Sequence, residues 1–217
     1  MEIVTFIDTL TDEMEPLRDI AVRLSSGLNE INGDMIALSH RPHVAPQSYA
    51  LRLNMPLPQA NLIQYQLIHK ITLSPHYLPI LQKLNGAEIF ELSLFGIPPS
   101  MANNPPLLDR TAAMPLDIAT ANAHWKFEYA IQNDWFHFGG GPLSLDENIG
   151  YFFDSVGKIY SIRKNGEIIN SWVLFSQFLY DEIFRCEALY PAYEEFMAEA
   201  ICEFGTKTPW WRKFFNQ

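Results

Sequence analysis

The chain has 217 residues, of which 48% are apolar and 18% are charged, and 25 acidic against 15 basic residues give a net charge of −10. This length and composition indicate a globular protein of one domain with an extension, or of two small domains at most. The acidic charge argues against nucleic acid as a partner, because neutralising phosphate groups requires Lys and Arg.

The first 58 residues are predicted to form an N-terminal extension. Apolar residues recur at helical spacing over Glu15–Leu28 and predict a helix there, with Pro16 in its first turn. Prolines interrupt residues 41–58, which we interpret as a linker or a sheet edge, although the alternation of Ser48–Leu53 favours a short strand. The extension thus combines a helix with a proline-rich linker.

Two helices and a strand follow. A first helix is predicted over residues 59–70. Ser74-Pro75 opens a second one, because a hydroxyl N-cap is followed by proline at the first helical position, and Asn85-Gly86 ends it in the manner of a left-handed C-cap. Glu88–Ile97, rich in Ile, Phe and Leu, is predicted to be one strand. A polar loop broken by prolines spans Ser100–Pro115.

A capped helix and an aromatic strand begin the second half of the domain. Asp117 is placed to cap a helix that carries Trp125 and Tyr129. Asp134–Phe138 is predicted to be a strand, and Gly139–Gly141 an abrupt turn or a strand bulge. A phosphate loop is disfavoured for these glycines, because a polar loop follows them where a helix N-terminus is required.

Two tight hairpins come next. Ile149–Asp154 and Lys158–Arg163 form the first, and Asn165-Gly166 turns the chain into Glu167–Asn170. Hairpins rather than crossover helices join these strands, so the predicted fold class is α+β. We expect an antiparallel sheet of mixed strand order, with about four to six strands flanked by helices.

The C-terminal part is predicted to be helical and to end in an aromatic tail. One apolar helix begins at Phe175, and a last helix spans Pro191–Phe204. The domain is accordingly assigned to residues 59–205 and the tail to residues 206–217. The tail is expected to pack against the domain or a second copy, with contact to a membrane interface as the alternative.

Several segments, taken in chain order, carry a family resemblance. They are Ser74–Gly86, Glu88–Gly96, Trp125, Trp135–Gly139, Asn148–Asp154, Gly157–Tyr160 and Ser176–Leu179. This ordered set, over roughly residues 59–184, resembles the SUKH superfamily. These Smi/Knr-type proteins include a yeast cell-wall assembly regulator and many bacterial immunity proteins.

The resemblance implies an α+β binding domain without catalytic activity or cofactors. Bacterial members typically neutralise polymorphic toxins by direct protein–protein binding, and the yeast member acts as a signalling scaffold. The expected function is therefore that of an immunity protein that binds a toxin. A regulatory scaffold of the cell-wall-regulator type is the alternative.

The residues themselves show no catalytic or metal-binding motif. Pro42 separates His40 from His43, and no carboxylate or cysteine ligand lies near them in the sequence. His137 lies in a predicted strand, where Asp134 projects to the opposite face because the two are three residues apart. We expect no enzyme, no metal and no cofactor. A hydrolase that uses His137 with nearby carboxylates is kept as a second alternative.

Acidic residues are the candidates for binding a partner. The pair Asp146-Glu147 lies in a predicted turn, and Asp134 and Asp154 belong to the same segment, so these four are the predicted partner-binding residues. Acidic residues also dominate 1–39 and 181–203. Charge complementarity with a basic toxin domain is one hypothesis, and solvated helix faces are the other.

The expected compartment is the cytoplasm. The N-terminus carries acidic residues where a secretory signal requires basic ones, and no apolar run approaches the ~20 residues of a membrane span. The chain has two cysteines, Cys186 and Cys202, so no disulfide framework is predicted.

Overall fold

The computed structural model describes residues 6–10, 12–26, 29–32, 35–42, 44, 48–98 and 115–205, with residues 29–32 and 197–205 as backbone only. Most of the loop predicted over Ser100–Pro115, the aromatic tail and the side chain of Cys202 lie outside the described residues.

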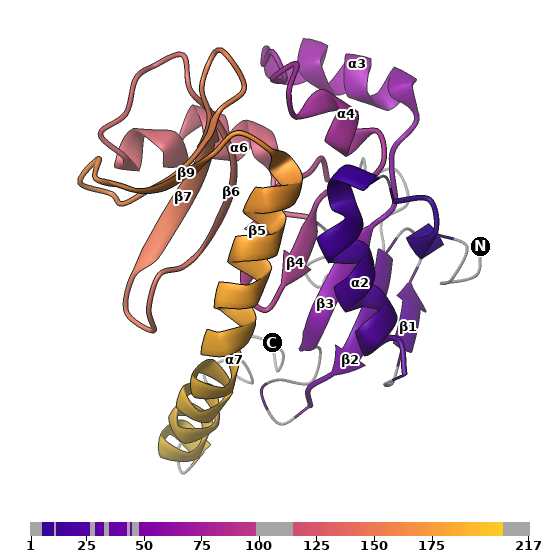
Figure 1. Cartoon of the computed structure of the whole chain (residues 1–217), viewed down its shortest axis with the longest axis vertical. Coiled ribbons are helices and arrows are strands. Elements are labelled where there is room, and N and C mark those ends of the chain that lie inside the picture. The colour runs from indigo at the N-terminus through magenta and orange to yellow at the C-terminus, as the bar shows by residue number, and fades with distance from the viewer. Residues whose placement is uncertain are drawn as a thin grey trace, which may run out of the picture.

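One antiparallel sheet organises the described chain (Figure 1). Its nine strands lie in sequence order, and each pairs antiparallel with the strand before it. The strands are β1 Asn29–Asn32, β2 Met35–His40, β3 Tyr49–Asn54, β4 Ala87–Ile89, β5 Leu92–Leu94, β6 Phe136–Pro142, β7 Asn148–Phe153, β8 Ile159–Ile162 and β9 Ile168–Trp172. The predicted α+β class with an antiparallel sheet is confirmed.

The strand number and order differ from the prediction. The sheet has nine strands in sequential order, rather than four to six in mixed order. Three of the nine come from residues 29–54, which were predicted to belong to the extension, and Glu88–Ile97 supplies two strands in place of one. Strands from residues 29–54 therefore share the sheet with the rest of the chain, and the domain division at residue 58 stays a prediction.

Helices cover both faces and one end of the sheet. They are η1 Asp12–Met14, α2 Glu15–Leu24, α3 Gln59–His69, α4 Leu78–Leu81, α6 Ile118–Ala123, η3 Trp125–Glu128 and α7 Phe175–Gly205. Helices α2 and α7 lie side by side across one face, and α3 and α4 lie at one end (Figure 1). Helix α6 packs on β6.

The core between the sheet and α7 is aromatic. Tyr77, Phe138, Tyr151 and Phe178 are fully buried, and the Phe138 ring lies 5.4 Å from the Phe178 ring in an edge-on arrangement. Such edge-on pairs add to the stabilisation that burial of the rings already provides. The apolar spacing that predicted the start of α7 is thereby explained, because it faces this core.

The Asn85-Gly86 pair has a structural role that its helix-ending pattern only partly predicts. Helix α4 is shorter than the predicted helix from Ser74 to Gly86. Gly86 has the expected left-handed backbone, with φ +83°, and a Cβ there would lie 2.8 Å from the carbonyl oxygen of Leu94. The buried Asn85 amide donates to the carbonyl of Ile97 and accepts from its N–H, both at 2.8 Å.

A strained turn divides the strand predicted over Glu88–Ile97. Phe90 and Glu91 join β4 to β5 with φ values of 48° and 72°. Two-residue hairpin turns of this kind require positive φ at both positions and strongly favour Asn-Gly sequences. Phe and Glu give no turn signal, so the prediction of one strand was wrong.

The three consecutive glycines lie inside β6 rather than in an abrupt turn. Gly139, Gly140 and Gly141 all pair with β7, and the register shifts between His137 and Gly139, as in a bulge. A Cβ on Gly139 would lie 2.6 Å from the carbonyl oxygen of Ser93 on β5. Close approach of β5 thus requires glycine there, and of the two predicted alternatives the strand bulge is confirmed.

Helix α7 continues through Pro191 instead of ending before it. Proline in a helix interior costs about 3 kcal/mol, because it removes one hydrogen bond and crowds the preceding turn. Pro191 is exposed, whereas Cys186 and Tyr190 on the inner side are buried. Packing of the inner side therefore outweighs the local preference that predicted two helices.

No helix in the described part of the chain is long and apolar enough to span a membrane.

We expect removal of the Asp117 cap to destabilise the fold. Its carboxylate accepts hydrogen bonds from the Ala119 N–H at 3.1 Å, from the Thr120 N–H at 3.3 Å and from the Tyr65 hydroxyl. Asp117→Ala should lower the free energy of unfolding by about 2 kcal/mol in urea denaturation. The exposed Asp134 provides the control, since Asp134→Ala should change the free energy of unfolding by less than ~0.5 kcal/mol. Equal effects would contradict the capping role.

A candidate protein-binding face on helices α2 and α7

Helix α7 presents two large aromatic side chains to solvent. Tyr180 and Phe184 are 65% and 69% exposed, and their spacing of four residues places them on the same side of the helix. The exposed Ala188 and Pro191 continue this side. The opposite side of α7 packs on the sheet, so the helix is apolar both inside and outside.

A groove separates α2 from this exposed aromatic stripe of α7, which Tyr180 and Phe184 form. It encloses about 270 Å³. Ile20 and Ile183 are buried, Tyr180 and Phe184 line its α7 side, and Asp19 lies on its α2 side. The apolar stripe therefore continues into an apolar groove.

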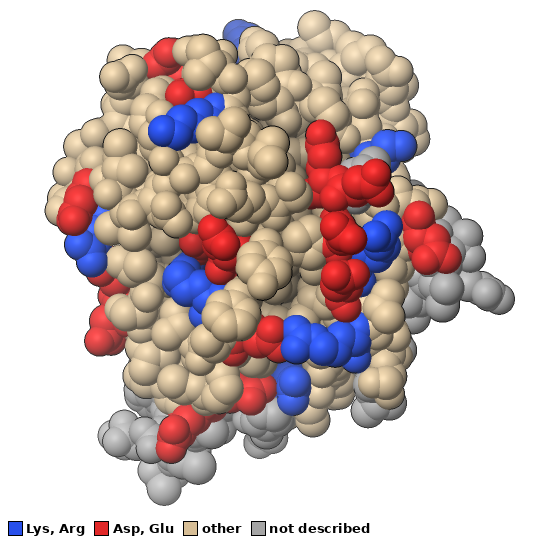
Figure 2. Space-filling view, viewed as in Figure 1, with Lys and Arg blue, Asp and Glu red and all other residues tan. Residues whose placement is uncertain are grey.

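Charged residues surround the groove, and most of them are acidic. Acidic and basic side chains gather on this side of the molecule around uncharged surface (Figure 2). The acidic residues of η1, α2 and the outer side of α7 here include Asp12, Glu13, Glu15, Asp19 and Glu187.

Two arginines neutralise part of this acidic charge. Arg18 pairs with Glu15 at 3.7 Å, and Arg23 pairs with Glu187 at 2.6 Å across the groove. Within the described residues, Asp12, Glu13 and Asp19 have no ion pair. We call the groove, the aromatic stripe and these acidic residues the α2–α7 face.

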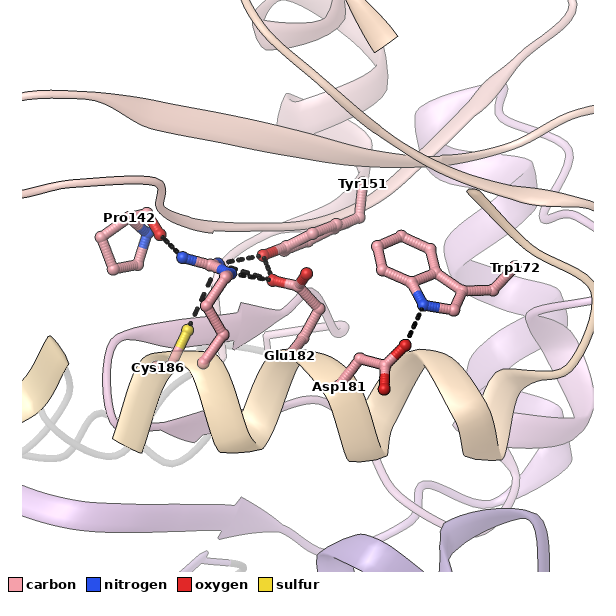
Figure 3. Close-up of polar contacts among 7 residues, drawn as sticks. Pro142, Tyr151, Trp172, Asp181, Glu182 and Cys186 are labelled. Carbon is pink, nitrogen blue, oxygen red and sulfur yellow. Dashed lines mark hydrogen bonds and ion pairs between the residues drawn. The ribbon is translucent and has the colours of Figure 1, made fainter. Parts of the chain in front are cut away.

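A buried polar network holds the inner side of α7 against the sheet (Figure 3). The Glu182 carboxylate accepts hydrogen bonds from the Tyr151 hydroxyl on β7 and from Arg185, whose Nε lies 3.0 Å away. The Arg185 guanidinium also donates to the carbonyl of Pro142 at the end of β6. One helical turn is thus joined to two neighbouring strands.

Burial sets the protonation states in this network. Burial, and then the negative charge of Glu182, raise the pKa of Tyr151 well above its usual value, so the hydroxyl stays a donor. Burial, the largest single effect, would lower the pKa of Arg185, but the hydrogen bond to Glu182 and the surrounding negative charge together outweigh it and raise the pKa. Burial raises the pKa of the Cys186 thiol to about 12, which makes the thiol unreactive near neutral pH.

A second contact fixes the first turns of α7. The Trp172 indole N–H at the end of β9 donates to the Asp181 carboxylate at 2.7 Å (Figure 3). Asp181 and Glu182 therefore face the sheet, and Tyr180 and Phe184 point outward as a consequence. The inner contacts determine which side chains α7 offers to a partner.

The structure divides the four predicted partner-binding residues between opposite ends of the sheet. Asp146 and Glu147 lie in the β6–β7 turn. Asp134 precedes β6, and Asp154 follows β7, so both lie at the other end of these two antiparallel strands. The four do not form one site, and none lies on the α2–α7 face.

The surroundings of these four residues also differ. Asp134 and Asp146 are exposed. Glu147 pairs with Arg163 at 2.9 Å. The Asp154 carboxylate accepts hydrogen bonds from the N–H groups of Val156 and Lys158, at 3.0 and 2.9 Å, and so stabilises the β7–β8 turn. Their role in partner binding stays a prediction.

His137 is buried, with 2% of its surface exposed. It lines a cavity that neither Asp146 nor Glu147 reaches. Among the described residues, no cluster of three His, Cys, Asp or Glu side chains is placed to hold a metal ion.

Sequence reasoning missed the aromatic stripe of α7. Helical spacing predicted the apolar helix that begins at Phe175, and its inner residues Phe178, Leu179 and Ile183 are buried. Tyr180 and Phe184 lie four residues apart in the same segment and form a second apolar side. That spacing was the signal available in the sequence.

Neither the protein-family models nor the curated proteins nor the solved structures contain a match to this chain.

We expect the buried network to stabilise the fold only while both charges are present. Glu182→Met leaves the Arg185 guanidinium without its carboxylate, and should lower the free energy of unfolding by about 3 kcal/mol. The double variant Glu182→Met/Arg185→Met should be less destabilised, because no charge is left unpaired. Urea denaturation of both single variants and of the double variant measures this coupling. If the double variant loses the sum of the unfolding free energies that the two single variants lose, the two charges are not coupled.

His137 should make the protein less stable in acid. Burial lowers the pKa of His137 to about 4 from its usual 6.5. Between these values the unfolded chain binds a proton that the folded chain excludes, so stability falls as the pH drops from 6.5 toward 4. The resulting loss in the free energy of unfolding that is due to His137 should reach about 3 kcal/mol.

The variant His137→Phe isolates this contribution. It keeps a ring of similar size among aromatic neighbours but does not titrate. Denaturation at neutral pH and near pH 4 should show a smaller acid loss for the variant than for the original chain. Identical pH profiles would show that His137 is not the group responsible.

Proposed function

We propose that this protein is a non-enzymatic binding domain whose α2–α7 face binds a basic protein. The observation that carries the proposal is the pair of exposed aromatic side chains, Tyr180 and Phe184, beside an apolar groove on a rigidly held helix. A helix that is apolar on its inner and outer sides is typical of one that packs against a second surface.

The chemistry of the face fits a protein interface. Buried aromatic residues at the centre of an interface commonly supply most of its binding energy, with polar residues around them. Covering Tyr180 and Phe184 would contribute about 1.5–3 kcal/mol for each side chain. The groove beside them provides room for an apolar side chain of the partner.

The acidic residues favour a basic partner. Asp19 lines the groove, Asp12 and Glu13 lie in η1 just before α2, and the whole chain carries a net charge of −10. Complementary charge accelerates association and disfavours acidic competitors. A nuclease toxin with a cationic substrate-binding surface has the required charge.

The particular function we propose is toxin neutralisation. This step rests on the resemblance to SUKH immunity proteins together with the acidic charge of the face. Occlusion of a toxin's active surface requires affinity and shape but no catalytic residue of the inhibitor. If the captured partner shows no toxic activity, the regulatory scaffold is the function that fits instead.

Capture of partners by the tagged protein, from lysate of the cells that express it, tests the proposal. We expect one basic protein to be retained at low salt and released at high salt, because ionic strength screens the rim charges. Phe184→Ser should reduce its retention at least tenfold, corresponding to about 1.4 kcal/mol. The purified partner should lose toxic activity when the original chain is added, but not when the Phe184 variant is added.

Phe127 provides a matched control, since its exposed fraction is 68% against 69% for Phe184. It lies on η3, away from the α2–α7 face, so Phe127→Ser should leave capture unchanged. Equal capture by the original chain and both variants would contradict the proposed face. Capture that is insensitive to salt would contradict the role of charge.

A further inference from the structure

Helix α3 presents a second apolar surface, at one end of the sheet (Figure 1). Ile63, Leu67 and Ile68 are 51%, 74% and 64% exposed. Ile63 and Leu67 are four residues apart and lie on the same side of the helix, and Ile68 widens this apolar patch. Leu62 and Tyr65 on the inner side are buried. Helix α3 is therefore apolar inside and outside, which is typical of a helix that packs against a second surface.

An open groove lies beside the exposed side chains. It encloses about 440 Å³ between α3 and the segment that follows it. Lys70, with φ 51°, turns the chain back, and the Ile71 N–H donates to the Gln66 carbonyl at 3.2 Å. The Gln66 side chain accepts a second hydrogen bond, from the Leu73 N–H at 3.0 Å. These contacts hold Ile71 in the same groove as Leu67, so a projecting side chain and a groove lie next to each other.

The inner side of α3 is joined to the start of α6. The Tyr65 hydroxyl donates to the Asp117 carboxylate and accepts from the Ala119 N–H at 2.9 Å. Asp117 also caps α6, so one cluster of contacts sets the orientation of both helices. Burial, and then the hydrogen bond to Asp117, raise the pKa of Tyr65, so its hydroxyl stays a donor near neutral pH. The apolar patch is thus presented on a helix that is held in one orientation.

The sequence around α3 carries no acidic residue. Residues 53–87 contain no Asp or Glu, and Lys70 and Lys83 are their only charged residues, although the whole chain has 25 acidic residues. The upper right end of the molecule, over α3 and α4, is almost entirely uncharged in Figure 2. A large net charge of one sign keeps copies of a protein apart. The α3 end is where two copies can approach with little repulsion between acidic side chains.

We propose that two copies of this chain associate through α3, with the two helices packed antiparallel about a two-fold axis. A two-fold contact requires a surface that is complementary to itself. The α3 surface meets this requirement, because Leu67 of each copy projects toward the groove of the other. Two helices of 11 residues, each about 16 Å long, form a contact at the low end of specific interfaces, so the dimer is reversible.

This dimer is independent of the function proposed above. The groove beside α3 shares no lining residue with the groove of the α2–α7 face. Pairing through α3 therefore leaves the α2–α7 face of each copy uncovered.

Sedimentation equilibrium of the full chain over a range of concentrations tests the inference. The mean mass should rise from 24.9 kDa toward twice that value, with a dissociation constant on the order of 10–100 μM. Added salt should strengthen the dimer, because it screens the repulsion between two chains of net charge −10. Salt should weaken capture of a basic partner, so the two proposals respond to ionic strength in opposite directions and fail separately. A monomer mass at every concentration up to roughly 1 mM would overturn the dimer.

Two substitutions in α3 test the surface itself. Leu67→Gln should weaken the dimer at least about tenfold, because it removes the projecting apolar side chain while Gln keeps a high helix propensity. Gln64 lies at the middle of α3, beside the two-fold axis. Gln64→Glu should weaken the dimer about threefold at low salt and less at high salt, because it brings two carboxylates together. Gln64 is exposed and Glu is nearly isosteric, so this variant tests the surface even if Leu67→Gln fails to fold.

Val173 provides a matched control, since its exposed fraction is 75% against 74% for Leu67. It follows β9 and lies outside the α3 surface, so Val173→Gln should leave the dimer unchanged. A dimer of full strength in Leu67→Gln, or one that Val173→Gln removes, would place the interface elsewhere and overturn the proposal. Loss of the dimer in Phe184→Ser would overturn it as well, since the copies would then associate through the α2–α7 face.

Discussion

The arrangement of the molecule depends on the ion pair between the partly buried Arg185 and the buried Glu182. Together with the Tyr151 hydroxyl, this pair joins one turn of α7 to β6 and β7. Charges removed from water stabilise a fold only when their partners are all in place, so the contact permits one orientation of the helix and disfavours others. The exposed aromatic stripe, the groove beside α2 and the acidic rim all follow from that orientation.

The sequential antiparallel sheet gives the protein two separate surfaces. Side chains alternate between the faces of each strand, so Tyr151 supports α7 while its neighbours Gly150 and Phe152 belong to the cavity around His137. One face is covered by α2 and α7 and presents an apolar stripe with an acidic rim. The other holds a small aromatic cavity with an unpartnered imidazole.

Two features of the fold are unfavourable when considered locally. Phe90 and Glu91 adopt left-handed backbone conformations without glycine, and His137 is buried without a hydrogen bond. Glu91 and His137 line one cavity, whereas Phe90 lines a separate one beside α7. Natural proteins carry such local conflicts mainly at functional sites, where the surrounding packing compensates for them.

The sequence by itself determined what depends on near neighbours. The hairpin of β7 and β8, the Asp117 cap and the buried side of α7 follow from spacing, turn chemistry and side-chain size, and all three were predicted. Tertiary structure decided the rest. The close approach of β5 requires glycine at Gly139 in β6, packing carries α7 past Pro191, and residues 29–54 extend the sheet to nine strands. The α2–α7 face joins segments more than 150 residues apart, as in the pair of Arg23 with Glu187. Such contacts have no local signal, because they depend on which surfaces remain to be buried once the strands have paired.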